Sequence, residues 1–349
     1  MKIAAVRSSF PQHWYDQKAL TEALVRLMGL RDRDADRLRS FHANSGIEGR
    51  FLVQPLERYT ADLDFTVANK VWLQGALDLG ERACRDALAA AGVRADEVAA
   101  IVFTTVTGLA SPSVDARLVT RLGLRPDVKR MPLFGLGCVA GAATIARAAD
   151  FLRGKPDGVV LVLSVELCSL TLQTKDQTLA NLVSVGLFGD GAAAAVVVGV
   201  ARAAAGPRIA ARRSVYYADT TVVLGGDIGA DGFRIVLSAE VPTVARERVP
   251  QVVDACLGAH GRPRRAIRRW IAHPGGPKVL LGLQEGLGLA QRDLQPSWDC
   301  LARAGNLSSA SVLMILEQHL RDPACKPGDL GLMLAMGPGF CSELLLLRW

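Results

Sequence analysis

Long apolar runs are missing from this 349-residue sequence. The longest candidate, GVVLVLSVELC at 158–168, carries Glu166 and falls short of the roughly 18 residues that a membrane-spanning helix needs. The first residues, MKIAAVRSSFPQHW, lack the basic-then-apolar layout of a secretory signal peptide. We therefore expect a cytoplasmic protein with no membrane span.

Aromatic and charged residues are also scarce, at 5% and 21% of the chain. The net charge of +7 is modest for this length, and no nucleic-acid recognition motif accompanies it, so we expect no nucleic-acid partner. A solvated arginine-rich surface accounts for the excess charge, and attraction to acidic substrates such as phosphate-bearing thioesters is the alternative. Half of the residues are hydrophobic, which predicts a compact globular protein.

Paired cysteine and histidine spacings are absent as well. No CxxC or HxxxH motif occurs, so the sequence predicts no metal site. The cysteines are odd in number and widely spread, which indicates reduced thiols and no disulfide framework. They are Cys84, Cys138, Cys168, Cys256, Cys300, Cys325 and Cys341.

The chain does contain a regular alternation of short apolar runs and longer helical patterns. Strands are predicted at 2–7, 98–108 and 159–166, and in the run that follows the glycine turn of 188–199. Helices are predicted at 18–42, at 71–92 with a stop at Gly92, and after Cys138. Continuous apolar strands separated by helices imply a sheet that is covered on both faces.

A segment rich in Ala, Gly and Arg at 201–211 is the best candidate for a linker. After it the alternation starts again, with helices at 240–258, 277–288 and from about Ser308, a strand that ends at His273, and two strands around a Gly-Pro-Gly turn in 329–349. FGDG and GPGF each precede a strand and resemble a weak internal repeat. We expect two related α/β halves, 1–203 and 204–349.

Cys138 lies where an apolar run breaks and a helical pattern begins, in PLFGLGCVAGAATIARAADFL at 132–152. Gly135 and Gly137 would turn the chain, and the positive end of the helix dipole would favour thiolate over thiol. A thiolate on a tight glycine-lined turn is a candidate nucleophile. The alternative is a small hydrophobic residue packed at the start of a core helix.

Two further polar residues flank predicted elements. In WIAHPGGP at 270–277, the strand ends at His273, and Pro274 with two glycines would present the imidazole beyond the strand. In AGNLSSASVLMILEQHL at 304–320, the Asn306 amide could donate to a developing oxyanion. The alternatives are a histidine satisfied by local backbone and an asparagine that caps a helix.

Together, in the order Cys138, His273 and Asn306, these motifs resemble the thiolase superfamily. Within it they resemble the type III polyketide synthases, which include chalcone synthase and the bacterial alkylresorcinol and alkylpyrone synthases. The resemblance runs from about residue 98 to the C-terminus and rests on GLGCVAGA, SVELCSLT, LFGDGAAA, WIAHPGGPKVL, GNLSSASVL and GPGF. It implies a five-layer αβαβα thiolase fold, a homodimer, CoA thioesters as substrates and no cofactor.

The resemblance also implies a role for each of the three residues. Cys138 would accept the starter acyl group as a thioester, and His273 would help to hold it as thiolate. His273 and Asn306 would bind the thioester carbonyl of malonyl-CoA and stabilise the enolate that forms as carbon dioxide leaves. Iterative extension of an acyl-CoA starter would then give a pyrone or a cyclised phenolic product. A single-round enzyme like ketoacyl synthase III and a non-catalytic acyl-CoA-binding protein of the same fold remain as alternatives.

Cavity and CoA positions are carried over from the same resemblance. The implied cavity residues are Phe188, Cys168, Thr171, Thr107, Ile235 and Ser308, and the cationic candidates for CoA are Arg37, Arg39 and Arg50. A core position for Phe188 and a solvated helix face for the arginines are the alternatives. Thr171, where the tetrahydroxynaphthalene type has a further cysteine, and aliphatic Ile235 favour the alkylresorcinol and alkylpyrone type with a fatty acyl starter.

Overall fold

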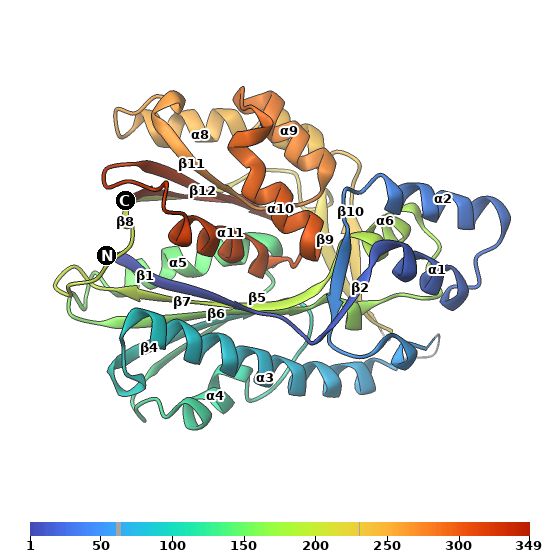
Figure 1. Cartoon of the computed structure of the whole chain (residues 1–349), viewed down its shortest axis with the longest axis horizontal. Coiled ribbons are helices and arrows are strands. Elements are labelled where there is room, and N and C mark those ends of the chain that lie inside the picture. Colours follow the sequence, from blue (N-terminus) through green and yellow to red (C-terminus); the bar gives the residue numbers. More distant parts are fainter. Residues whose placement is uncertain (61–63, 230) are drawn as a thin grey trace.

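The computed structural model describes residues 1–60, 64–229 and 231–349. Figure 1 shows two stacked sheets with helices below, between and above them. Helices α3 (Phe65–Ala91) and α4 (Val114–Leu122) form one outer layer, and α8 (Val249–Gly258) and α9 (Pro277–Leu287) form the other. Helices α5 (Ala140–Phe151) and α11 (Ser309–Arg321) lie between the sheets. The expected five-layer αβαβα arrangement is therefore confirmed.

The strands follow the order β11-β12-β13-β8-β1-β7-β6-β4-β5. Strands β1 and β8 share one residue pair, Lys2 with Arg208, so this junction separates the two stacked groups. The bounds in the first group are β1 (Lys2–Ser9), β4 (Val98–Thr105), β5 (Lys129–Phe134), β6 (Val159–Leu167) and β7 (Asp190–Val198). Those in the second are β8 (Arg208–Tyr216), β11 (Ile267–Ala272), β12 (Leu330–Gly337) and β13 (Cys341–Arg348).

The apolar sequence pattern explains why the central strands are buried. Every residue of β4, β6 and β7 is buried, as continuous apolar runs covered on both faces require. The middle layer shares one core cluster with both sheets, in which Ile145 of α5 and Ile315 of α11 are fully buried. The two halves are therefore joined through the packing of their central helices.

The smaller elements surround one end of the sheets, at the right of Figure 1. They include the strand pairs β2–β3 and β9–β10 and the helices α1, α2 and α6, which the sequence predicted only in part. Their bounds are α1 (Gln17–Leu27), α2 (Asp32–Ala43), α6 (Leu179–Leu187), β2 (His13–Asp16), β3 (Gly49–Leu52), β9 (Leu224–Gly229) and β10 (Gly232–Leu237). Two further helices, α7 (Val241–Glu247) and α10 (Gln295–Ala304), pack on α9 and α11 respectively.

Two sequence predictions need correction. The helix expected at 240–258 is two helices, α7 and α8, because Pro250 has no amide hydrogen with which to continue the first one. The expected linker at 201–211 is too long, since β8 already begins at Arg208. Ile209 and Ala211 alternate with more exposed arginine and alanine there, and the alternation buries one face of the strand.

Helices α5 and α11 approach each other closely at Gly141. A Cβ atom there would lie 2.1 Å from the carbonyl oxygen of Ser309 and 2.7 Å from Cγ1 of Val312. Only glycine allows this approach, which sets the N-terminal ends of the two central helices side by side.

We expect Gly141→Ala to lower the free energy of unfolding by about 1–3 kcal/mol, because the added methyl group must push backbone aside. Urea unfolding of the variant measures this loss. Gly154→Ala is the matched control, since its added Cβ would meet nothing closer than 3.9 Å. Equal losses in the two variants would contradict this account of the helix contact.

Candidate active site

Cys138 lies in the turn that joins β5 to α5, as the sequence predicted. Gly135 and Gly137 have φ values of 87° and 54°, which side-chain-bearing residues rarely adopt. A Cβ atom on Gly137 would lie 2.6 Å from Cδ of Pro338, so the Gly-Pro-Gly loop packs directly on this turn. The two glycines therefore fix where the sulfur emerges.

The segment that precedes α11 brings Ser308 and Asn306 to the same place. Sγ of Cys138 lies 3.6 Å from Oγ of Ser308. Oδ1 of Asn306 accepts a hydrogen bond from the backbone N–H of Ser308 at 2.8 Å. Ser308 has a φ of 47°, a strained conformation for serine that this local bond helps to hold. The structure thus joins residues from the two halves across the middle layer.

His273 immediately follows β11, where the strand was expected to end. Its backbone N–H donates to the carbonyl of Leu334 at 2.8 Å, whereas its ring is 2% exposed. Within the described residues, neither ring nitrogen has a hydrogen-bond partner. The alternative of a histidine satisfied by local backbone is therefore wrong. Nδ2 of Asn306 donates to the carbonyl of Gly275 at 3.3 Å, which ties the Asn306 segment to the His273 loop.

Burial controls the charge of these groups. It raises the pKa of the Cys138 thiol to about 12, although hydrogen bonds with Ser308 and Asn306 act in the opposite direction. Burial also lowers the pKa of His273 to about 3. The thiolate at the helix start stays a prediction, and desolvation acts against it. Burial favours a neutral thiol and a neutral imidazole, so a thiolate here needs a base that accepts the proton.

A cavity of about 770 Å³ opens beside Cys138. The structure places all six sequence-predicted cavity residues along its wall, namely Phe188, Cys168, Thr171, Thr107, Ile235 and Ser308. Its wall also includes four residues of α1 that no sequence motif assigned to a cavity, namely Leu20, Ala23, Leu24 and Leu27. The cavity therefore runs from the cysteine to an apolar helix near the N-terminus.

Glu166 is the site residue that the sequence reasoning missed. It lies near the end of β6, is fully buried, and accepts hydrogen bonds from the backbone N–H of Val106 at 3.0 Å and from Oγ1 of Thr107 at 3.1 Å. Oγ of Ser309 donates to its other carboxyl oxygen. The sequence does contain a signal for Glu166, namely a carboxylate within a mostly apolar strand. A buried carboxylate requires polar partners in the folded chain. Glu166 connects β4, β6 and the start of α11 beneath Cys138.

The three arginines proposed for CoA lie in different environments. Arg50 is 4% exposed, and its guanidinium donates to the carbonyls of Phe188 at 2.6 Å and Val185 at 2.8 Å. Arg39 pairs with Glu22 at 2.8 Å, and Arg37 lies 3.8 Å from Asp34. Only Arg50 of the three is on the cavity wall. Their CoA role stays a prediction.

Comparison with known proteins agrees with this geometry. The N-terminal domain of the chalcone and stilbene synthases matches residues 2–201, and the C-terminal domain matches 209–349. A 1,3,6,8-tetrahydroxynaphthalene synthase of Streptomyces peucetius is 48% identical over 99% of this chain and 93% of its own. A phloroglucinol synthase of Pseudomonas fluorescens is 31% identical over 97% of each chain.

Among solved structures, the bacterial type III polyketide synthase that makes 1,3,6,8-tetrahydroxynaphthalene in Streptomyces coelicolor superposes with a TM-score of 0.95. It is 30% identical and covers 100% of this chain and 99% of its own. The layered fold, with a cysteine before one central helix and an asparagine before the other, defines an acyltransferase of the thiolase type. The chain belongs to the chalcone and stilbene synthase family and is a type III polyketide synthase. None of the helices described here is long and apolar enough to span a membrane.

The pKa of Glu166 provides a test of the buried network. Burial raises it from 4.5 to about 7, so the folded chain binds more protons than the unfolded chain between these values. Stability must then fall as pH rises through this range. We expect wild type to lose about 3 kcal/mol relative to Glu166→Gln between about pH 4.5 and pH 7, and lose no more above it.

Urea unfolding at a series of pH values measures this difference. Glu240→Gln, at an exposed position at the start of α7, is the control and should follow the wild-type pH dependence. Parallel curves for wild type and Glu166→Gln would show that the carboxyl group is not desolvated as described.

Proposed function

We propose that this type III polyketide synthase condenses malonyl-CoA repeatedly onto an acyl group carried by Cys138. The observation that carries the proposal is the His273 ring, which is buried with no partner for either nitrogen among the described residues. Its loop is tied to Asn306 through Gly275, and the segment of Asn306 reaches Cys138 through Ser308. Decarboxylative condensation requires a donor pair and a nucleophile close together, and Cys138 and Ser308 line the cavity.

Loading would begin when Cys138 transfers its proton to the neutral imidazole of His273. The sulfur then attacks the thioester carbon of the starter, a carbon–sulfur bond forms to Cys138, and the bond to CoA breaks. CoA leaves as a thiol with the proton that His273 held. Because burial disfavours a lone thiolate and a lone imidazolium, the two charges would exist only together and only briefly.

Extension would use His273 and Asn306 as donors to the thioester oxygen of malonyl-CoA. Carbon dioxide leaves, the electron pair of the broken carbon–carbon bond forms an enolate, and its oxygen accepts both hydrogen bonds. The enolate carbon attacks the acyl group and releases the Cys138 sulfur. A neutral imidazole suits this step, since it keeps an N–H with which to donate. Such donors stabilise the negative charge on the enolate oxygen most strongly where water is excluded.

Two observations favour different starters. Leu20, Leu24 and Leu27 give the cavity an apolar arm along α1, which suits a fatty acyl starter and alkylpyrone or alkylresorcinol products. The 48% identical relative is a tetrahydroxynaphthalene synthase, which favours a product built from malonyl units alone. The naphthalene skeleton corresponds to five two-carbon units. The shape of the cavity supports the fatty acyl starter, and the tetrahydroxynaphthalene synthase supports the malonyl starter.

We also propose that the chain works as a homodimer, as the resemblance implies. Phe134 lies on the cavity wall and is 49% exposed, and Leu109 is 40% exposed. Covering these side chains with a second subunit would remove apolar surface from water at the edge of the site.

Incubation with labelled malonyl-CoA and a series of acyl-CoAs, followed by mass analysis, tests the function. We expect products with several added two-carbon units, and acyl labelling of Cys138 in quenched wild type. Cys138→Ala should abolish both. His273→Ala removes both the base for loading and one donor, so it should lower acyl labelling and lower product formation by about 100- to 1000-fold.

Cys256→Ser, which removes a buried thiol of α8, is the control and should keep condensation. A single added unit in every product would instead identify a single-round condensing enzyme. Binding of acyl-CoA without any condensation would identify a non-catalytic protein. Product formation by Cys138→Ala would overturn the assignment of the nucleophile.

Ala23 tests the choice of starter, because it is a small, half-buried residue on the apolar arm. We expect Ala23→Phe to lower kcat/KM for the longest acyl-CoA substrates at least tenfold and to leave products made from malonyl-CoA alone unchanged. Ala89→Phe, on the exposed face of α3, is the matched control. An equal effect on all starters would show that the arm does not hold the acyl chain.

A further inference from the structure

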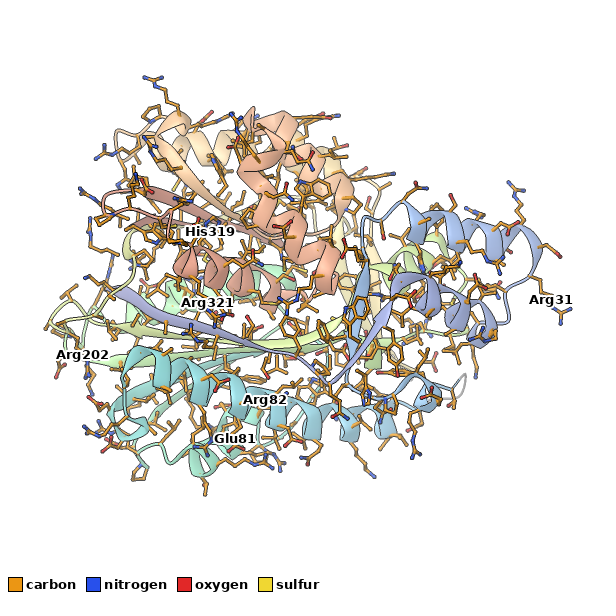
Figure 2. The ribbon with its side chains drawn as sticks, viewed as in Figure 1. Arg31, Glu81, Arg82, Arg202, His319 and Arg321 are labelled. Carbon is orange, nitrogen blue, oxygen red and sulfur yellow. The ribbon has the colours of Figure 1, made fainter. Side chains whose placement is uncertain are left out.

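The C-terminal end of α11 carries a cluster of three different metal-ligating side chains far from Cys138. A ring nitrogen of His319, a carboxylate oxygen of Asp322 and Sγ of Cys325 all lie within 4.8 Å of one another. His319 is ten residues beyond Ser309, or about 15 Å along the helix. Figure 2 shows His319 toward the end of α11 that lies away from the lobe of α1 and α2.

The imidazole of His319 has an unmet hydrogen-bonding requirement. The residue is 5% exposed, and Nε2 has no partner in the part of the chain that the structure describes. A buried polar atom without a hydrogen-bond partner lowers the stability of the fold, so a ligand bound to Nε2 would explain why the histidine is present. A hydrogen bond to the backbone of Trp270 also holds the ring, an outer contact of the kind that fixes metal-binding histidines.

The charges around the cluster are suited to a divalent cation. Asp322 and Asp329 both face Arg269, at 2.9 Å and 3.4 Å, and the side chain of Asp329 is only 13% exposed. Arg268 is mostly exposed and lies 3.8 Å from Asp329. With Cys325 as thiolate, three negative charges would lie beside the partly buried guanidinium of Arg269 and the exposed one of Arg268, so a net negative charge would remain to attract a divalent ion. The guanidinium of Arg269 would also orient the Asp322 carboxylate.

We propose that His319, Asp322 and Cys325 bind one zinc ion, with water as the fourth ligand. Nitrogen, sulfur and oxygen ligands together suit zinc better than magnesium or calcium, which take oxygen ligands. Cys325 now donates its S–H to the carbonyl of His319 at 3.1 Å. On binding, that proton passes to solvent and a zinc–sulfur bond replaces the hydrogen bond. Asp322 has a side chain that is 36% exposed, which leaves room for the water.

The geometry needs a small adjustment. Zinc–ligand distances of roughly 2.0–2.3 Å place tetrahedral ligand atoms about 3.5 Å apart, closer than the 4.8 Å limit of the cluster. Cys325 lies on the turn between α11 and β12, where a side-chain rotation can close this gap. The bound ion would join the last turn of α11 to the chain that enters β12.

Zinc titration of the untagged, EDTA-treated chain by calorimetry tests this site. The Cys138→Ala background removes the active-site thiol as a competing ligand. We expect about one zinc ion per chain, a higher Tm with zinc, and a thiolate-to-metal absorption band when cobalt(II) is bound instead. Cys325→Ser should weaken zinc binding at least about 100-fold, beyond the effect usual for an outer-shell change, and remove the band.

Cys256→Ser in the same background is the matched control and should keep both the zinc ion and the band. Asp322→Asn is a second variant that removes a charge without removing volume, and we expect weaker zinc binding with the cobalt band retained. Zinc binding and a cobalt band that survive Cys325→Ser would overturn the proposal. Failure of the parent to bind zinc would do the same. Neither result depends on polyketide synthesis, so the proposed function would stand.

Discussion

The contact between α5 and α11 at Gly141 is the constraint on which the site depends. It holds the N-terminal ends of two helices from different halves of the chain within reach of each other. Cys138 precedes one helix and Ser308 precedes the other, so the sulfur-to-hydroxyl distance of 3.6 Å follows from the helix packing. Each half packs its outer helices on its own sheet, and the groups to which we assign catalysis lie where the two halves share a core.

Desolvation shifts the pKa values of the ionisable groups where the two halves meet. It raises the pKa of Cys138 and Glu166 and lowers that of His273, so each group is held closer to its neutral form. A site of this kind disfavours isolated charges before a substrate arrives. In the proposed mechanism, charge develops along the reaction, where the His273 and Asn306 donors would stabilise it. Glu166 contributes through hydrogen bonds that fix Thr107, on the cavity wall, and Ser309, at the start of α11.

The sequence could predict the layers and the three central residues because both are local signals. Continuous apolar runs, glycine stops and the segments around Cys138, His273 and Asn306 each lie within a few residues of one another. Glu166 was missed because its partners, Val106 and Ser309, are distant in sequence and meet it only in the folded chain. The apolar arm of the cavity formed by α1 was missed for the same reason. Its leucines predict an amphipathic helix, but nothing in their spacing says that they face a cavity rather than another helix.

Arg50 shows why residue type alone does not place an arginine at the surface of the fold. An arginine near a predicted phosphate site suggests an exposed cation, yet Arg50 is buried and its guanidinium holds the carbonyls of Val185 and Phe188. Burial lowers its pKa to about 10, and nearby Asp190 acts in the opposite direction. Its guanidinium is therefore held among protein groups, although the residue also lies on the cavity wall. By hydrogen bonding to the carbonyl of Phe188, Arg50 fixes the backbone of a second cavity residue, so the shape of this part of the wall depends on an internal cation.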